Sequence, residues 1–551
     1  MLGNIQKPHA QHLAKSSVTQ DLLESDRNCS MAIIGCGASG VAALTSIIEV
    51  LEYSGNRKYK ISIFEKNVSF GSGVAYQCDS EDLLMNMISS TTSVISGKEL
   101  DFWEWMIDRG HSVSKDQVMS GSGVSPDGYI SRQFFGRYLR SRLDASIVRA
   151  QEIGVDVDLI NTEVIDIKIE GRGFKVICST LNQCTFDYVI LCIGNNQPKD
   201  VFELSGKDRY VNDPYPINRY AKHIDKKASV GIIGGQLTAA DIAIVMANQG
   251  HSGPIYFLTR DSNFPLLRSS IKEFSLKHLT LDALQLLKLS NPTGISLRQL
   301  LRLARKDFFR AGIRWNKFFK MPNVSYHSWI QDLLANPCLY ASWQHLAIAT
   351  DSVIAEYWDA FLVKEKKLFM EKHHRAWMSR RVPLPIQTAM KLHSLFASET
   401  LKHYPNLITI KSHPNHKFIA HISNVGFGAE TEFLVCDWVI NATGPSRLID
   451  DKGNSPLVGN LLKSGMIFTD PMGGVLVDFE TSLVKRENHD LMHKFYAIGH
   501  LTSGTYYFVS SLDMVSLRAK RVALHIVQSA ETHSMPKADE GLENSESRYV
   551  S

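Results

Sequence analysis

The chain of 551 residues is too long for one compact core, and its 44% hydrophobic content is enough to bury about two or three domains. Its 60 basic and 56 acidic residues give a formal net charge of +4, so the overall charge indicates neither a nucleic-acid nor a membrane partner. The eight cysteines form no C-x-x-C pair and no zinc spacing, so we expect no metal site and a cytoplasmic protein. No apolar run reaches the length that spans a bilayer.

A glycine-rich turn near the amino end indicates a first nucleotide site. It lies between a predicted strand over residues 31–34 and a predicted helix over 41–51. The next strand, over 59–64, ends in Glu65, whose carboxylate can accept hydrogen bonds from adenosine ribose hydroxyls. Three glycines allow, in order, the tight turn, the approach of backbone to a pyrophosphate and close helix packing: Gly35, Gly37 and Gly40. The pattern predicts a dinucleotide site, the alternative being a turn that only closes a helix-strand unit.

A second glycine turn, at Gly234, indicates a second nucleotide site. It separates a predicted strand over 229–234 from a predicted helix over 238–248. Gln236 stands where the usual fingerprint has its second glycine, and a side chain there can hinder the pyrophosphate. Thr238 and the helix N-terminus can still donate hydrogen bonds to phosphate. We therefore expect a nicotinamide cofactor here, with loss of cofactor binding in this half as the open alternative.

The strand after the second helix, predicted over 254–259, ends in Arg260 rather than in an acid. An arginine at this point can pair with a ribose 2′-phosphate, whereas an acid would repel it. We therefore expect NADPH in preference to NADH, unless Arg260 only faces solvent at the end of its strand.

Two apolar runs, over 188–195 and 438–445, read as buried strands that end in glycine. A glycine at the end of a buried strand lets the chain pass close to a cofactor. A core role alone would also explain either strand. The pattern favours the cofactor interpretation because each run follows a nucleotide unit.

Three segments after the first turn combine glycine loops with polar residues, over 71–76, 83–87 and 129–139. They resemble the bacterial FAD/NAD(P)-binding flavoproteins with two dinucleotide domains, relatives of flavin-containing and N-hydroxylating monooxygenases. The resemblance covers about residues 30–525. It implies an α/β protein with two Rossmann-like dinucleotide-binding domains, each of three layers, and a helical insertion. It also implies that the first cofactor is FAD.

The resemblance assigns roles to individual residues. The positions that match Asn86 and Arg132 lie near the flavin in such proteins, although capping or surface roles are the alternative here. The run that ends in Thr443 and Gly444 is similar to their Ala-Thr-Gly motif. Their closing segment approaches the pyrophosphate or the isoalloxazine, and a loop that merely joins strand and helix is the alternative. The candidates in that segment are Gly499 and Gly504.

Long amphipathic segments occupy residues 264–403 and form the expected helical insertion. Acids interrupt the basic runs in this stretch, so we expect no nucleic-acid binding. The insertions of related flavoproteins carry a basic residue shortly before a proline, similar to Arg380 or Arg381 before Pro383. Such an arginine could hold a substrate carboxylate or contact the second nucleotide.

The order of these features predicts interleaved domains. The predicted parts are a flexible N-terminal tail over 1–29, the first part of the FAD-binding domain over 30–228, the NAD(P)-binding domain with its insertion over 229–436, the return of the FAD-binding domain over 437–528 and a flexible C-terminal tail over 529–551.

The expected cofactors indicate an FAD/NAD(P)H-dependent oxidoreductase. In the leading interpretation NADPH reduces FAD, which then reacts with molecular oxygen to a flavin hydroperoxide that hydroxylates a small nitrogen-containing substrate. Two alternatives remain open: an NAD(P)H-dependent flavin reductase or oxidase that oxygenates no substrate, and a non-catalytic nucleotide-binding protein. The sequence identifies no catalytic acid or base, no particular substrate and no oligomeric state.

Overall fold

The computed structural model describes residues 29–55, 59–109, 126, 128–270, 272–315, 324–423, 431–450, 455–509 and 511–534. The predicted N-terminal tail lies outside the described residues except for Cys29, which begins the first strand. Of the predicted C-terminal tail, residues 535–551 lie outside them, and the part before residue 535 belongs to the last helix. Within the described ranges, no helix is long and apolar enough to cross a membrane.

The first domain is built on a six-stranded sheet in the order β16-β17-β7-β1-β2-β3. Neighbouring strands are parallel except for the antiparallel pair β16 and β17. The strands are β1 (Cys29–Ile34), β2 (Tyr59–Glu65), β3 (Asp156–Asn161), β7 (Tyr188–Leu191), β16 (Leu483–Lys485) and β17 (Leu491–Ala497). The long separation between β7 and β17 shows that the chain leaves this sheet and later returns to it.

Two layers cover this sheet, one on each face. Alternate residues of β1 point to opposite faces and so contact different layers. Met31 and Ile33 pack against three helices, whereas Ala32 and Ile34 pack against an antiparallel meander. The helices are α2 (Ala38–Ser54), α5 (Arg132–Glu152) and α19 (Leu512–Ser534), and the meander strands are β4 (Val164–Glu170), β5 (Gly173–Cys178) and β6 (Gln183–Phe186). The result is the expected three-layer α/β arrangement.

The second domain repeats this plan with a five-stranded sheet in the order β11-β10-β9-β15-β8, in which all pairs are parallel. The strands are β8 (Tyr210–Val211), β9 (Val230–Ile233), β10 (Ile255–Leu258), β11 (Leu401–Tyr404) and β15 (Trp438–Asn441). Helices α7 (Leu237–Asn248) and α16 (Ile386–Ala397) pack on this domain, which also carries a meander of β12 (Leu407–His413), β13 (Lys417–Ser423) and β14 (Thr431–Cys436).

The strand pairing corrects the predicted domain boundaries. Strand β15 hydrogen-bonds to β9 and β8, so the run that ends in Gly444 belongs to the second sheet and not to the return of the first domain at 437. Strand β8 also joins the second sheet, so the first part of the first domain ends before residue 210 rather than at 228. The chain re-enters the first domain only after Gly444, where α17 (Pro456–Lys463) donates from Asn460 to the carbonyl of Ile165.

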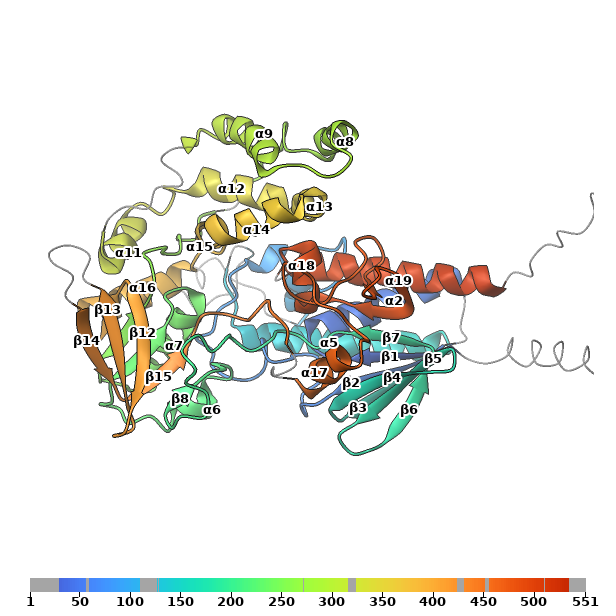
Figure 1. The fold of residues 1–551 in the computed structure, drawn as a ribbon, viewed down its shortest axis with the longest axis horizontal. Helices are drawn as coiled ribbons and strands as arrows, with labels where there is room; N and C mark the ends of the chain where they lie inside the picture. Colours follow the sequence, from blue (N-terminus) through green and yellow to red (C-terminus); the bar gives the residue numbers. More distant parts are fainter. Residues whose placement is uncertain are drawn as a thin grey trace, which may run out of the picture.

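The expected helical stretch is present between β10 and β11. In Figure 1 its green and yellow helices form a layer above the two sheets, while α16 packs back on the second domain. These helices are α8 (Leu281–Ser290), α9 (Leu297–Arg310), α11 (Tyr326–Ala335), α12 (Ala341–Ala349), α13 (Ile354–Ala360), α14 (Val363–Lys372) and α15 (His374–Arg381). Shorter helices are η1 (Ser89–Thr91), α3 (Asp101–Asp108), α6 (Asn218–Ala221), η2 (Thr350–Ser352), η3 (Gly499–Thr502) and α18 (Ser503–Tyr506).

Candidate functional site

The first glycine turn joins β1 to α2. Gly35 has a φ of +101°, and a Cβ there would lie 2.4 Å from the carbonyl oxygen of Cys192. A Cβ at Gly40 would lie 2.2 Å from the carbonyl oxygen of Gly35, so the fold itself requires both glycines. At Gly37 the nearest atom to a Cβ would be the Cα of Gly73, at an ordinary 3.4 Å. Packing therefore leaves Gly37 unexplained, and its position at the start of α2 fits backbone approach to a pyrophosphate.

Glu65, at the end of β2, braces this turn. Its Oε2 accepts the backbone N–H of Cys36 at 2.8 Å. Its Oε1 accepts the backbone and side-chain N–H groups of Asn67 at 2.9 and 3.0 Å. These bonds occupy three of about four acceptor positions of a buried carboxylate. Its binding to ribose hydroxyls stays a prediction, and one acceptor position is left for it.

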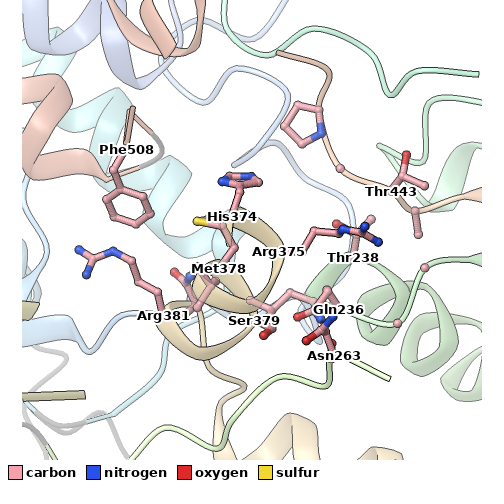
Figure 2. A pocket seen from close by; sticks show the side chains of 18 of the residues that line it. Gln236, Thr238, Asn263, His374, Arg375, Met378, Ser379, Arg381, Thr443 and Phe508 are labelled. Carbon is pink, nitrogen blue, oxygen red and sulfur yellow. The ribbon is translucent and has the colours of Figure 1, made fainter. Parts of the chain in front are cut away.

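The second turn joins β9 to α7. Gly234 has a φ of +124°, and a Cβ there would lie 2.7 Å from the carbonyl oxygen of Ala442, just after β15. Gln236 is the N-cap residue of α7, but its side chain donates from Nε2 to the carbonyl oxygen of Asn263. Figure 2 shows these two residues side by side. The side chain of Gln236 is thus tethered to the loop after β10, which reduces the hindrance expected at this position.

A cavity of about 700 Å³ lies between these two domains and the insertion. Its lining comes from the loop over 85–92, the carboxyl ends of β9, β10 and β15, helices α12 and α15, and the chain between His500 and the first turn of α19. The carboxyl ends of parallel strands are the usual ligand site of such sheets. The predicted site residues that line this cavity are Asn86, Gly234, Thr238, Arg260, Arg381, Thr443 and Gly444.

The other predicted residues are not among the lining residues of this cavity: Gly35, Gly37, Gly40, Glu65, Arg132, Arg380, Gly499 and Gly504. The first four form the separate turn beside β1. Arg380 is buried and donates to the carbonyl of Ala376 on its own helix at 2.9 Å, so only its neighbour Arg381 faces the cavity. Of the two predicted arginines only Arg381 lines the cavity, and its contact with a substrate or with the second nucleotide stays a prediction.

The two glycines of the closing segment, Gly499 and Gly504, lie against different parts of the protein. A Cβ at Gly499 would lie 2.5 Å from the Oγ of Ser39, so this segment runs against the first turn of α2, and its contact with the cofactor stays a prediction. A Cβ at Gly504 would lie 2.1 Å from the carbonyl oxygen of Gly473 and 2.4 Å from the carboxyl carbon of Asp470. Packing of α18 on that turn therefore suffices to explain Gly504, and its contact with a cofactor stays a prediction.

Arg132 connects the two domains instead of facing the cavity. Its Nη2 lies 2.8 Å from Oδ2 of Asp241, in α7, and its Nη1 donates to the hydroxyl of Tyr215 at 3.1 Å. The Tyr215 hydroxyl donates to the same Asp241 oxygen at 2.6 Å. Desolvation acts to lower the pKa of Arg132, but Asp241, Tyr215 and Tyr76 together outweigh it and raise the pKa, so the guanidinium stays charged. Arg132 therefore makes an interdomain contact that the sequence did not indicate, and its place near the flavin stays a prediction.

Arg268 is a cavity residue that the sequence patterns missed. It is only 6% exposed, and its Nη2 donates to the carbonyl oxygen of Asn86 at 2.7 Å. Its Nε is buried with no hydrogen-bond partner among the described residues. Burial lowers its pKa to about 10. No motif surrounds Arg268, so nothing local in the sequence distinguished it from a surface arginine.

A cluster around Tyr507 closes one side of the cavity. Tyr507 has a φ of +63° and a ψ of −62°, and the N–H of Phe508 donates to the carbonyl of Tyr506 at 2.8 Å, which defines a strained γ-turn. Arg447 holds the turn by donating from Nη1 to the carbonyl of Tyr507 at 3.1 Å. The Tyr507 hydroxyl lies 2.9 Å from Nδ1 of His374. The Arg447 and His374 side chains are thereby fixed at the cavity wall.

Among the described residues, the cavity lining carries five arginines and three aspartates, so basic side chains outnumber acidic ones. Arg381 is buried with its guanidinium 4.2 Å from the ring centre of Phe508, and burial lowers its pKa to about 10. Figure 2 shows Arg381 reaching toward Phe508, with Arg375 on the other side of the cavity near Thr238. Burial, together with nearby Arg447, lowers the pKa of His374 and of His500 to about 4, so both are neutral at pH 7. The site therefore suits anionic ligands.

Comparisons with known proteins confirm the predicted resemblance. Residues 32–196 match the FAD-NAD(P)-binding family. An ornithine hydroxylase from Pseudomonas aeruginosa has a similar structure, with a TM-score of 0.54 at 13% identity over 91% of this chain and 99% of that chain. The L-lysine 6-monooxygenase of Pseudomonas syringae gives 0.57 at 12% identity, with the same coverage. A cadaverine monooxygenase of Erwinia amylovora, bound to FAD, gives 0.54 at 11% identity over 94% and 99%. No curated protein matches at the sequence level. At these identities the likeness shows a shared fold.

Proposed function

We propose that the chain is an FAD-dependent oxidoreductase that uses NADPH, with a Rossmann-like dinucleotide-binding domain on each parallel sheet. FAD would bind at the turn of Gly37 and the N-terminus of α2, and NADPH at the turn of Gly234 and the N-terminus of α7. One observation carries the proposal: Asn86 of the first domain and Thr238 of the second line the same cavity. Two cofactors held by the two turns would therefore share one reaction space.

The preference for NADPH rests on Arg260. This exposed arginine follows β10 and lines the cavity, where a ribose 2′-phosphate could receive its guanidinium. The neighbouring Arg375 is engaged with Asp261, at 2.7 Å between Nη1 and Oδ2. Arg260 is thus the better candidate of the two for a bidentate contact with phosphate.

The reaction that we propose is hydroxylation of a small nitrogen-containing substrate with molecular oxygen. FAD, when bound, supplies the redox chemistry and the activation of oxygen. The residues of the chain hold the substrate and exclude water: Arg268 and Arg381 can bind an anionic group, and α15 with Phe508 walls the cavity. The neutral imidazole of His374, fixed by Tyr507, adds a hydrogen-bonding group without adding charge. The fold shared with an ornithine hydroxylase and a lysine monooxygenase supports this reaction class.

The test begins with the purified protein and its flavin absorbance spectrum, followed by anaerobic reduction with NADPH and, separately, with NADH. Candidate amines are then supplied with oxygen while hydroxylated product and hydrogen peroxide are both measured. Product formed in proportion to NADPH supports the monooxygenase. Peroxide formed in proportion to NADPH, whichever amine is present, would assign a reductase or oxidase instead. Failure of either nucleotide to reduce the flavin would reject the oxidoreductase and favour a non-catalytic nucleotide-binding protein.

Arg260→Ala tests the choice of nucleotide. We expect the Kd for NADPH to rise about tenfold to a hundredfold, as for loss of one or two charge-assisted hydrogen bonds, with little change for NADH. The matched control is Arg298→Ala, which removes an exposed arginine of α9 outside the cavity lining. An equal loss for the two nucleotides would reject the proposed contact with the 2′-phosphate.

A further inference from the structure

A second cavity, of about 450 Å³, lies within the helical insertion, apart from both glycine turns. This volume is in the range of about 300–1,000 Å³ that small-molecule sites occupy. Its walls come from α9 and the helices α12 to α15 and are almost entirely apolar. They include Leu297, Leu301, Val353, Trp358, Phe361 and Phe369. A cavity with such walls suits a ligand with a hydrocarbon body.

Helix α15 separates this apolar cavity from the reaction cavity. His374, Met378 and Arg381 lie three or four residues apart and line the reaction cavity, as Figure 2 shows. Ala376 and Trp377 lie on the opposite side of the helix and line the apolar cavity. The two cavities also share the ring of Tyr507. The two cavities are therefore neighbouring spaces on opposite sides of one helix.

Among the described residues, the one acid in the wall of the apolar cavity already has hydrogen-bond donors for its carboxylate. Asp307 is 1% exposed, and its carboxylate accepts the backbone N–H groups of Lys277, His278 and Leu279 at 2.9 to 3.1 Å. Arg310 donates to it from Nη1 at 2.8 Å. These four bonds and the arginine charge leave no acceptor for an incoming amine. The cavity therefore does not suit a cationic ligand.

The described lining also contains His373, Thr350, Tyr357 and Tyr507, and two of its other polar groups, Trp377 and Lys372, are hydrogen-bond donors. The Nε1 of Trp377 is buried and has no hydrogen-bond partner among the described residues. Lys372, which is exposed at the end of α14, also lines the cavity. A buried N–H without an acceptor costs roughly 1–3 kcal/mol, so a ligand oxygen that reached it after a small shift of the Trp377 ring would be favourable. Together the two groups favour a ligand with an acceptor or a negative charge.

We propose that the apolar cavity binds a small carboxylic acid with a hydrocarbon chain. The chain would lie among the leucine and aromatic side chains, and the carboxylate would pair with Lys372 or accept from Trp377. This site is distinct from the nucleotide turns, and the proposal does not rest on the reaction proposed above. Its occupant would contact Tyr507 and α15, which also position His374 and Arg381 in the reaction cavity.

The experiment titrates the full-length protein with dansyl-labelled undecanoic acid and follows dansyl emission excited through the tryptophans. Trp315, Trp358 and Trp377 line the cavity, so energy transfer reports binding close to them. We expect saturable binding with a blue shift. Ala304→Phe, which fills the cavity, should weaken it about tenfold or more. Leu301→Trp fills the same space from a partly buried position and serves if Ala304→Phe does not fold.

Control variants test separately how the hydrocarbon chain and the carboxylate head group of the ligand contribute to binding. Leu286→Phe adds a ring at a position of α8 that is 67% exposed and outside the cavity lining, and should bind like the wild type. Lys372→Met should weaken the acid about threefold to fivefold, the size of an exposed ion pair, without weakening the matching dansyl amide. No saturable binding to the wild type, or unchanged binding by both cavity-filling variants, would overturn the site. If the acid and the amide bind equally well and Lys372→Met weakens neither, the cavity does not recognise the carboxylate and that part of the proposal is wrong. Each result is obtained without nucleotide or turnover and is therefore independent of the proposed reaction.

Discussion

Replacing Asp241 with alanine should destabilise the protein by several kcal/mol, because it leaves the guanidinium of Arg132 buried between the domains without its carboxylate. The two side chains are only 8% and 19% exposed, respectively, and their atoms lie 2.8 Å apart. Tyr215 loses its acceptor in the same variant. Removing one partner of a buried ion pair costs about 3–5 kcal/mol, mostly as the penalty for the unpaired charge that remains.

The matched control is Asp158→Ala. Asp158 pairs with Lys60 at 3.1 Å, but these side chains are 50% and 52% exposed, so solvent screens the pair. Its loss should cost about 0–1 kcal/mol. A third variant, Arg132→Met with Asp241→Leu, removes both charges and should be less destabilised than Asp241→Ala, because no unpaired charge stays buried.

Urea unfolding at pH 7, followed by tryptophan fluorescence and by circular dichroism, gives the comparison. Both probes are needed because two domains need not unfold in one transition. If Asp241→Ala costs no more than Asp158→Ala, the interdomain pair does not contribute as argued. If the double variant is as unstable as Asp241→Ala, the penalty arises from lost packing rather than from the buried charge.

Three further results are expected. Gly37→Ala should fold normally but retain less than about a tenth of the wild-type FAD absorbance, because its Cβ has space in the protein yet projects where a pyrophosphate would pass. Gly35→Ala, in contrast, should fail to fold. Undiminished FAD absorbance in Gly37→Ala would contradict the predicted pyrophosphate site. Gln236→Gly should change the Kd for NADPH by less than about threefold, because the Gln236 side chain of the wild type is held by Asn263. Tenfold tighter binding of NADPH to the variant would show that the Gln236 side chain blocks the site. Burial lowers the pKa of His374 from 6.5 to about 4, so between these pH values the unfolded state binds more protons and the free energy of unfolding falls as the pH drops. His374→Phe should remove up to about 3 kcal/mol of this loss, measured by denaturation at a series of pH values. If the free energy of unfolding of the variant depends on pH as steeply as that of the wild type, the reasoning is wrong.

The sequence was sufficient where a short motif determines its own geometry. The turns at Gly35 and Gly234 each lie between a strand and a helix, as predicted, because left-handed backbone and close approach leave glycine as the residue that fits. The position of Arg260 at the cavity also followed from its place directly after a strand of the second sheet. These features depend on contacts within one strand-turn-helix unit.

The sequence was insufficient where a partner lies far along the chain. The apolar runs before Gly194 and Gly444 look alike, yet β7 lies in the first sheet and β15 in the second. Strand pairing with β9, about 200 residues earlier, makes that choice, and no local pattern encodes it. The ion pair of Arg132 could not be predicted for the same reason, since Asp241 reaches it from the other domain.

Arg268 shows how burial can reveal a ligand site that motifs do not. A buried cation is costly unless it is paired, and Arg381 meets this condition through Asp351. Among the described residues the only oxygen that accepts from Arg268 is the carbonyl of Asn86, which brings no negative charge. A phosphate, a carboxylate or an electron-rich ring in the cavity would supply that charge and would gain more from Arg268 than from an arginine already in water. Arg268, a buried cation without a carboxylate partner among the described residues, is therefore one of the side chains that should contribute most to binding.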